Sequence, residues 1–599
     1  MQNDTKNAII FAVIAGLAMI AYQAFILEPQ AKLAEAARKA KAAAVQAAPA
    51  STPVSGPLQP NLARPQALAI SPRVRVETPA LSGSIALRGA RLDDLYLNTY
   101  HETVAKTSPR VELLRPEGMA AAYFAEQGWI GANLPGVPTP ATLWTQTEGA
   151  TLSPGHPITL SYAVPGGLSF TRRISVDDKA MFTVADTVAN LGPAAITLAP
   201  YVSVQRQGLP SGLAQSNIVH EGAIGVLGTD GPQLRLTNYK DWKKKGEVDW
   251  QSKGGWFGVT DKYWMTAFIP AQTETISAKA RVTTDAATGI DIYETTYSSA
   301  GRSIAPGTQI TEVSHLFAGA KTVPVLNAYS ASLGVPRFVD AVDWGNLWFL
   351  TKPIFSLLEF FYSHVGNFGL AILMLTVVIR LITFPLANKG FEMGVKMKKI
   401  QPELQSLQKR LKDDPAAQQK EMMALYAREK VNPITGCVPI LFQIPVFYSL
   451  TKLFTVTIEM RHAPFFGWIH DLSAPDPTTF LNLFGLIPWD PSLTPLIGGV
   501  LGGFLHVGVW PLLYGMSMWL SQSMTPQTGI DPTQQMIFKF MPLMFTFILA
   551  QYAVGLLIYW TWSSLITILQ QYVMMRRFKV DNPIDDFLGR FSARAGTSG

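Results

Sequence analysis

Cysteine is almost absent from this chain of 599 residues, because Cys437 is the only one. One thiol cannot form a disulfide within the chain, and structural zinc sites need several cysteine or histidine ligands. The sequence also lacks His-Glu-x-x-His, Gly-x-Ser-x-Gly and Walker motifs, which carry metalloprotease, hydrolase and nucleotide chemistry. We therefore expect neither an enzyme nor a cofactor, and no metal site.

Charged residues are also scarce, at 15% of the chain, whereas 48% of the residues are hydrophobic and lie in blocks. About twenty apolar residues are enough to cross the ~30 Å hydrocarbon core of a bilayer as a helix. This profile indicates an integral membrane protein with a substantial soluble part. The net charge of +7 is located beside the apolar blocks, so we expect no direct nucleic-acid partner.

Residues from about Val74 to Gly319 have a different texture, with short alternating runs separated by turn signals such as Asn-Leu-Gly-Pro. Alternation at period two predicts an all-β domain, which we interpret as one large sandwich. Its histidines and carboxylates show no spacing typical of a metal site or a nucleophile. We assign no chemistry to this domain.

Basic residues set the orientation of the apolar segments. The stretch 388–432 holds ten Lys and Arg residues and is cytoplasmic by the positive-inside rule, whereas the loop after the third segment has only Arg461 and lies outside. Within 388–432, Asp414 and Pro415 predict an N-cap and a first-turn proline for the second helix of a hairpin. Alternation then gives six spans, both termini inside and the β domain outside.

The fold class that follows is a polytopic α-helical membrane protein with a large periplasmic all-β sandwich. The expected parts are an N-terminal transmembrane anchor (1–27), an Ala/Pro-rich tether (28–72), the β-sandwich (73–343), an interfacial amphipathic helix (344–366), transmembrane helix 2 (367–387), the cytoplasmic hairpin (388–432), transmembrane helix 3 (433–457), a periplasmic loop (458–496), transmembrane helices 4 (497–521), 5 (537–551) and 6 (553–574), and a cytoplasmic tail (575–599).

Arg380 is the only formal charge in the apolar segment 367–387. A cation at membrane depth costs roughly 2.5–3.5 kcal/mol on insertion scales, so it is paired, hydrated or snorkelling toward the interface. The apolar runs of the other five segments, the first of which is 7–27, contain no Asp or Glu, but they hold many Ser, Thr and Gln residues. An arginine among such residues suggests a water-containing cavity. A snorkelling arginine remains the alternative.

Several long stretches resemble the bacterial YidC membrane insertase family, which is shared with mitochondria and chloroplasts. They include SKGGW at 252–256, WFLTKPIF, VVIRLITFPL, RHAPFFGWIHDLSAPDP, DPTQQMIFKFMPLMFTFILA and GLLIYWTWSSLITILQQ, and the likeness covers nearly the whole chain. It implies a β-supersandwich and five core helices around a hydrophilic groove that is open to the cytoplasm and to lipid. The groove would receive the polar part of an incoming protein, whose apolar segments then leave into lipid.

The resemblance also implies roles for individual residues. The groove residues would be Arg380, Thr376, Gln443, Tyr559, Trp560 and Ser563; the residues along which substrates slide would be Ile440, Phe442, Phe447, Met544 and Phe545; and the adaptable contacts of the hairpin would be Met393, Met397, Met422 and Met423. Trp560 stands where the family often has tyrosine, and an indole cannot donate a hydrogen bond as a hydroxyl does. The stretch 480–503 is longer than in the family.

The implied partners are nascent membrane proteins, the Sec translocon and membrane lipids in a bacterial inner membrane. The ribosome and the signal-recognition-particle receptor are further candidates, although the short tail with five basic residues implies no strong ribosome contact. Two other functions stay open on the residues alone. One is a channel or transporter in which Arg380 selects an anion, and the other is a sugar-binding receptor built on the β domain.

Overall fold

The computed structural model describes residues 61–579 and 583–585, except for 132–133, 166, 211, 214–218, 413, 432–437, 490, 492–493, 496–497, 504, 525–531 and 580–582. The expected anchor at 1–27 and most of the expected tether at 28–72 lie outside the described residues. The first described element is the short helix α3 (Arg64–Ala69).

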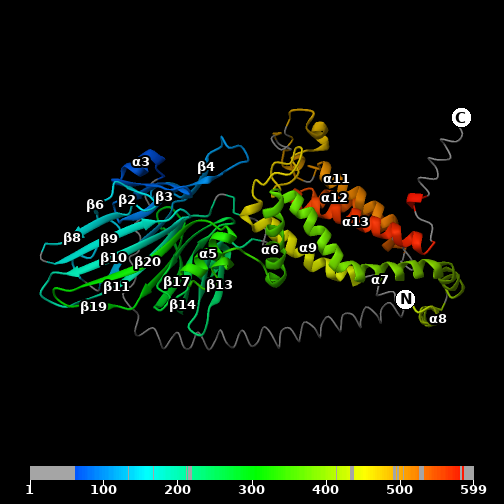
Figure 1. Cartoon of the computed structure of the whole chain (residues 1–599), viewed down its shortest axis with the longest axis horizontal. Helices are drawn as coiled ribbons and strands as arrows, with labels where there is room; N and C mark the ends of the chain where they lie inside the picture. Colours follow the sequence, from blue (N-terminus) through cyan, green and yellow to red (C-terminus); the bar gives the residue numbers. More distant parts are fainter. Residues whose placement is uncertain are drawn as a thin grey trace. The chain divides into compact units, whose positions relative to one another are not determined.

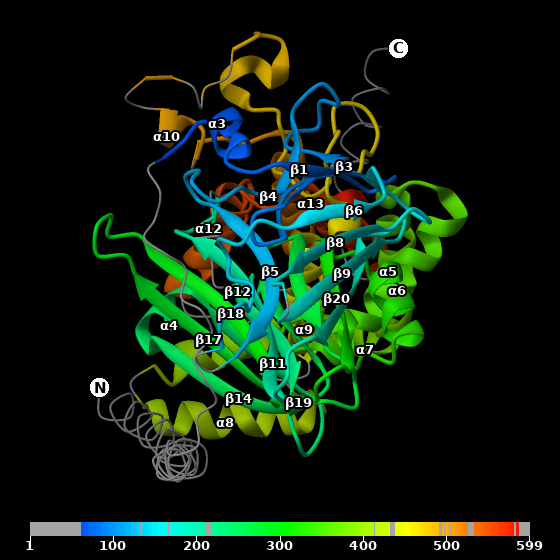
Figure 2. The ribbon, with the colours of Figure 1, turned by 90° about the vertical axis from the view of Figure 1, so that its left-hand side faces the viewer.

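Two mainly antiparallel sheets form the large domain that precedes the helical region, so the prediction of a large all-β domain is confirmed (Figure 1, Figure 2). One sheet contains β14 (Glu247–Lys253), β17 (Thr275–Thr284), β18 (Asp291–Ser299), β11 (Ile196–Gln207), β5 (Tyr123–Ile130), β3 (Arg91–His101), β2 (Leu81–Ala86), β1 (Arg73–Glu77) and β7 (Thr151–Leu152), in that order, with β19 (Arg302–Ile304) on β11 and β4 (Arg110–Leu114) on β3. The other contains β13 (Gln233–Asn238), β12 (Gly222–Leu227), β15 (Trp256–Thr260), β16 (Trp264–Ile269), β20 (Gln309–Ala320), β10 (Met181–Asn190), β9 (Leu168–Val176), β8 (Ile158–Ala163) and β6 (Thr145–Glu148).

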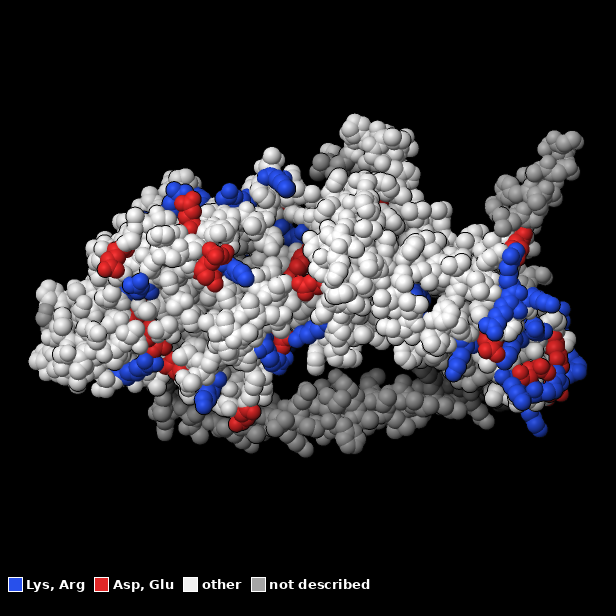
Figure 3. All heavy atoms as spheres, viewed as in Figure 1, with Lys and Arg blue, Asp and Glu red and all other residues white. Residues whose placement is uncertain are grey.

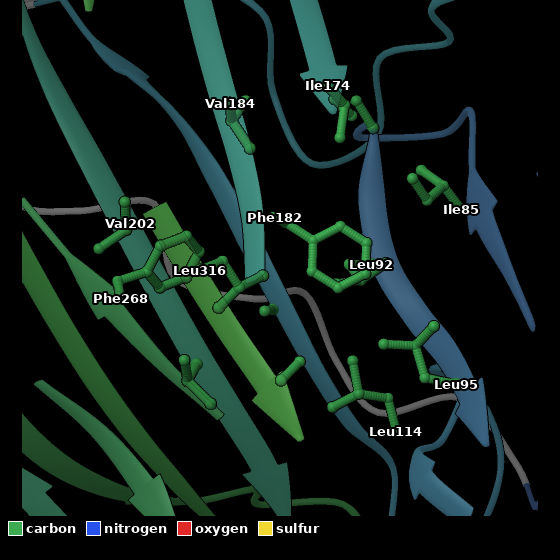
Figure 4. Packing of buried hydrophobic residues seen from close by; sticks show 14 of the residues in the cluster. Ile85, Leu92, Leu95, Leu114, Ile174, Phe182, Val184, Val202, Phe268 and Leu316 are labelled. Atoms are coloured by element: carbon green, nitrogen blue, oxygen red, sulfur yellow. The ribbon is translucent and has the colours of Figure 1, made fainter. Parts of the chain in front are cut away.

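Apolar side chains of both sheets meet in one core. Leu92 and Val202 come from the first sheet, and Phe182 and Leu316 come from the second (Figure 4). Alternate residues of a strand point to opposite faces, so the period-two pattern of the sequence supplies one apolar face to each sheet. The buried area of this core stabilises the domain, at roughly 25 cal/mol per Å² of apolar surface.

A buried ion pair, Arg172–Asp186, lies inside this core. Asp186 of β10 stands directly opposite Arg172 of β9 in the strand register, and both side chains are buried. The guanidinium donates two hydrogen bonds of 2.7 Å to the carboxylate and a third, of 2.9 Å, to the carbonyl oxygen of Gln127. The pair therefore joins the facing strands and reaches across to the other sheet.

The remaining elements are mainly helical. They are α4 (Tyr239–Lys245), α5 (Val323–Ser332), α6 (Trp348–Val365), α7 (Phe368–Arg410), α8 (Pro415–Arg428), α9 (Val438–Val456), α10 (Gly498–Leu501), α11 (Val509–Met524), α12 (Pro532–Leu549) and α13 (Val554–Arg577), with the 3₁₀ turns η3 (Phe338–Ala341), η5 (Ile458–Met460) and η6 (Phe480–Gly485). Within the described part of the chain, residues 368–397 of α7 are long and apolar enough to cross a membrane, and residues 538–549 form a shorter apolar helix.

The stretch 497–521, which was expected to form one transmembrane helix, is not a single helix in the structure. It contains the short α10 and the separate α11, which begins only at Val509. Asp476 and Thr478 fix this start, because the Asp476 carboxylate accepts from Trp510 N at 2.8 Å and the Thr478 hydroxyl accepts from Val509 N at 3.0 Å. A Cβ on Gly508 would lie 2.6 Å from the Asp476 carboxyl carbon, so only glycine fits before this cap.

Two polar contacts join the segment after the sandwich to α9 and to the turn that follows it. Lys452 Nζ of α9 lies 2.6 Å from Asp343 Oδ2, and the lysine is buried. Glu459 Oε1 accepts from Val323 N, at the start of α5, at 2.8 Å. Burial raises the pKa of the Glu459 carboxyl to about 7. The sequence reading overlooked Lys452, although a lysine in an apolar segment was a visible signal.

Residues 399–432 belong to a different compact unit from the rest of the described chain. The predicted cap of α8 is confirmed, because the Asp414 carboxylate accepts from Ala416 N and Ala417 N and Pro415 occupies the first turn. Arg410 Nη2 lies 2.6 Å from Glu421 Oε2, which joins the end of α7 to α8. Lys and Arg side chains gather on this unit, whereas few charges are seen on the middle of the helical region in the face that Figure 3 shows.

Candidate functional site

Arg380 and Ser563 meet between α7 and α13. Arg380 Nε donates to Ser563 Oγ at 2.7 Å, and Nη2 of the same guanidinium contacts the same oxygen. The arginine is half-buried and the serine is buried. Within the described residues no carboxylate forms an ion pair with Arg380, so a neutral hydroxyl is its partner. Two contacts to one hydroxyl leave most of the five guanidinium N–H donors for other acceptors.

Gln443 and Tyr559 extend this polar contact toward α9. Tyr559 lies one turn before Ser563 on α13 and is fully buried, and its hydroxyl accepts from Gln443 Nε2 at 3.3 Å. We call Arg380, Ser563, Tyr559 and Gln443 the polar seam. Three helices thus contribute to the seam, and its members are separated by up to 183 residues of sequence.

A cavity of about 350 Å³ lies beside the polar seam. Its lining comes from α7 and α13 and includes Arg380, Asn388 and Gln570. Gln570 Nε2 donates to Asn388 Oδ1 at 2.6 Å and so closes a second polar contact between the two helices. The sequence reading gave no role to Asn388, because its partner is 182 residues away and nothing in the spacing predicts the contact.

Thr376 lies one turn before Arg380 on α7 but turns its hydroxyl into its own helix. Its Oγ1 donates to Ile372 O at 2.7 Å, and the side chain is fully buried. Other buried hydroxyls have no hydrogen-bond partner within the described residues, namely those of Ser449, Thr451 and Thr561. Because buried polar groups in proteins normally have a partner, these hydroxyls are suitable contacts for water in the helical region.

Trp560 faces away from this hydrogen-bond system and packs against aromatic rings. It stacks on Phe447 of α9, with centroids 5.0 Å apart and an interplanar angle of 7°, and it contacts Tyr514 of α11 at 5.4 Å. Trp560 therefore contributes aromatic packing between α9, α11 and α13. Nothing in the sequence indicated the contact with Tyr514.

This packing gives a testable difference in stability. Because Trp560 is buried, we expect Trp560→Ala to destabilise the protein by about 3–5 kcal/mol. Tyr559→Phe removes one hydrogen bond and should cost only about 0.5–1.5 kcal/mol. Melting temperatures of the purified full-length protein in detergent would measure both. Trp562→Ala is the control, since Trp562 is an exposed tryptophan of the same helix, and an equal loss there would contradict the packing role.

The residues proposed for substrate sliding divide into two groups. Phe442 of α9 and Met544 of α12 are 57% and 50% exposed. Phe447 and Phe545 are half-buried, and Phe447 is held by Trp560. The side chain of Ile440 lies outside the described residues. The exposed apolar set on these helices also includes Ile444, Phe540, Leu543 and Ile548.

The four methionines assigned to the hairpin differ in exposure. Met423 is exposed on α8, and Met422 is half-buried with its sulfur 4.0 Å from Gln408 Nε2. Met393 is half-buried and Met397 is buried on α7. Within the compact unit 399–432, Met423 is therefore the methionine of this set that is open to a partner.

Two family models match this chain in succession. The YidC periplasmic domain matches residues 73–357, and the 60Kd inner membrane protein matches residues 360–582. The membrane protein insertase YidC of Caulobacter vibrioides is 54% identical over 99% of both chains, and that of Rhizobium etli is 43% identical over 100% of both. A crystal structure of an active YidC insertase covers 84% of this chain and 92% of its own, with 16% identity and a TM-score of 0.34.

The fold and the matched models define an inner-membrane protein with a periplasmic β domain in front of its helical region. At this identity over the full length, the chain belongs to the YidC family of membrane protein insertases. It is an insertase rather than an enzyme, and membrane proteins are its substrates.

Proposed function

We propose that the polar seam receives the hydrophilic part of an incoming membrane protein while the apolar segment of that protein passes along α9 and α12 into lipid. One observation carries this proposal: Arg380 is a half-buried cation with a hydroxyl and no carboxylate as its partner in the described residues. A substrate carboxylate would form a charge-assisted hydrogen bond with it, about twice as strong as a neutral one.

The topology proposed with this function has six membrane-spanning helices, five of which form the core around the Arg380 region. Both termini lie in the cytoplasm and the β domain lies outside. Support comes from the ten basic residues at 388–432 and from the mostly uncharged helices α9 to α13. With this topology the hairpin formed by the end of α7 and by α8 faces the side on which proteins are made. The Sec translocon is the proposed partner for larger substrates, and the ribosome and the signal-recognition-particle receptor are proposed contacts of the hairpin side.

The proposed sliding surface rests on exposed apolar side chains of α9 and α12. Phe442 stands one residue before Gln443 on α9, and Met544 lies on α12. A segment that leaves the seam beside α9 and α12 would keep its apolar side chains against other apolar side chains. It would then never have to expose them to water, which costs roughly 25 cal/mol per Å².

Site-specific photo-cross-linking tests this path. We expect a photoreactive amino acid at Phe442 or Met544 to cross-link to a nascent single-span protein stalled on the ribosome. Trp519 is the matched control, because it is 62% exposed on α11 and lies outside the proposed path. Cross-links of equal yield at all three positions would contradict a defined path along α9 and α12.

A further inference from the structure

Residues 480–489, which we call the apolar lobe, present a compact set of uncharged side chains. No Lys, Arg, Asp or Glu occurs from residue 477 to residue 489. Leu486 is 84% exposed, more than any other large hydrophobic residue described. The exposed set of the lobe consists of Phe480, Leu483, Phe484, Leu486, Ile487 and Trp489. In Figure 3 the region forms an uncharged protrusion, and Figure 2 shows its helical turn standing clear of the strands.

Several polar groups of the lobe bond to one another or to the residues just before it. Asn482 is buried; its Oδ1 accepts from Gly485 N at 2.9 Å, and its Nδ2 donates to Trp489 O at 3.2 Å. Phe484 N donates to Thr479 O at 2.8 Å. Backbone groups that are satisfied internally can enter an apolar medium at little cost, whereas unpaired ones cost several kcal/mol each. The lobe therefore has a polar interior and an apolar exterior.

Two residues of the lobe have backbone angles that are unfavourable for bulky side chains. Leu483 and Phe484 both adopt left-handed φ angles, of 50° and 58°. Bulky residues avoid this region, and such outliers persist where the surroundings or a function require them. The left-handed pair belongs to the turn that Asn482 closes, and both of its side chains are exposed. An environment that favours exposed apolar side chains would offset this cost.

The depth of the lobe follows from its attachment to α11. Phe480 N donates to Val507 O at 3.0 Å, and Asp476 and Thr478, just before the lobe, cap the start of α11. α11 has 16 residues. At ~1.5 Å per residue it is ~24 Å long, which is less than the ~30 Å hydrocarbon core. If α11 crosses the membrane as proposed above, the lobe at its outer end lies at the boundary of the outer leaflet.

We infer that the apolar lobe inserts into the outer leaflet of the lipid bilayer beside α11. The inference rests on the proposed topology, and its ligand is lipid rather than a protein. Protein-binding patches carry a polar rim around an apolar centre, whereas the exposed side chains of the lobe are uncharged throughout. Trp489 suits the boundary between acyl chains and headgroups, where tryptophan is enriched. The lobe would thus hold the outer end of α11 at a fixed depth.

Depth-dependent fluorescence quenching of the full-length protein tests the inference. In a Cys437→Ser background, Leu486→Cys would carry an environment-sensitive fluorophore in vesicles of phosphatidylethanolamine and phosphatidylglycerol. We expect a blue-shifted emission that is quenched by lipids spin-labelled near the headgroup and protected from aqueous iodide. Leu191→Cys is the matched control, because Leu191 is a 60% exposed leucine of the β domain; it should be quenched by iodide alone.

Two outcomes would overturn the inference. One is quenching of the Leu486 label by iodide and not by spin-labelled lipid. The other is protection from iodide without quenching by lipid, which would indicate a protein surface on the lobe. The test is separable from the proposed function, because Arg380→Ala in the labelled protein should reduce insertion roughly ten- to a hundredfold and leave the quenching pattern unchanged. Loss of the quenching pattern in a protein that still inserts its substrates would contradict the inference about the lobe and leave the proposed function unaffected.

Discussion

Replacing Arg380 by alanine should reduce the insertion of a small membrane protein with an acidic translocated tail by roughly ten- to a hundredfold. A hydrogen bond to a charged group contributes about 1.5–3 kcal/mol, and each 1.4 kcal/mol is a factor of ten. Arg380→Lys should retain most of the activity, because lysine keeps the positive charge and lacks only the planar array of N–H donors of the guanidinium. The measurement is the fraction of substrate inserted in cells depleted of the native protein and resupplied with each variant.

Two controls make this result specific to charge at the polar seam. Lys539→Ala removes an exposed cation of α12 and should leave insertion unchanged. A substrate whose tail carboxylates are replaced by amides should lose its dependence on Arg380. Equal activity of wild type and Arg380→Ala on the acidic substrate would reduce Arg380 to a hydration or snorkelling role. If depletion itself had no effect on insertion, an anion channel would be the function to test.

The partner of Arg380 marks the limit of what its sequence context predicts. A lone cation in an apolar segment, together with the absence of carboxylates in the other segments, predicts a polar or hydrated environment. It does not select Ser563 from the many serines and threonines in those segments, since the two residues are 183 positions apart. Helical periodicity fixes which residues share a face, whereas the pairing of faces depends on the packing of the whole bundle.

Sequence patterns within one segment predicted the structure of that segment more successfully than they predicted contacts between distant segments. Alternation at period two identified the β domain, and Asp414 with Pro415 identified the start of α8. The order of the strands was not predictable, because β11 pairs with β18 and β5, which are far from it in sequence. The late start of α11 was missed for the same reason: its cap, Asp476, is 34 residues away from Trp510. The apolar composition of 497–521 cannot reveal a cap that comes from another segment.

The Arg172–Asp186 pair shows how such long-range geometry controls stability. The pair lies across β9 and β10, and the guanidinium packs over the ring of Trp144 at 4.8 Å from its centroid. Both charges are buried, so each compensates the desolvation of the other. Removing one partner leaves an uncompensated buried charge, which costs about 3–5 kcal/mol. Breaking the pair therefore lowers the stability of the domain mainly because it leaves the remaining charge buried without a partner.

Asp186→Asn should therefore lower the melting temperature of the β domain by about 6–20 °C, since 1 kcal/mol corresponds to about 2–4 °C in a domain of this size. Asparagine has nearly the shape of the carboxylate, but it has no negative charge and offers one acceptor oxygen in place of the two that bind Arg172. Glu77→Gln is the matched control, because Glu77 lies 3.2 Å from Arg75 in a pair that is exposed on both sides. An exposed pair contributes only about 0–1 kcal/mol, so the melting temperature of the control variant should hardly change. Circular dichroism of the full-length protein in detergent, followed in the β region of the spectrum, gives both values. If the two substitutions lower the melting temperature equally, another acceptor compensates the charge of Arg172. The nearest acceptors are the carbonyl oxygens of Gln127 and Ala90, which already contact its guanidinium.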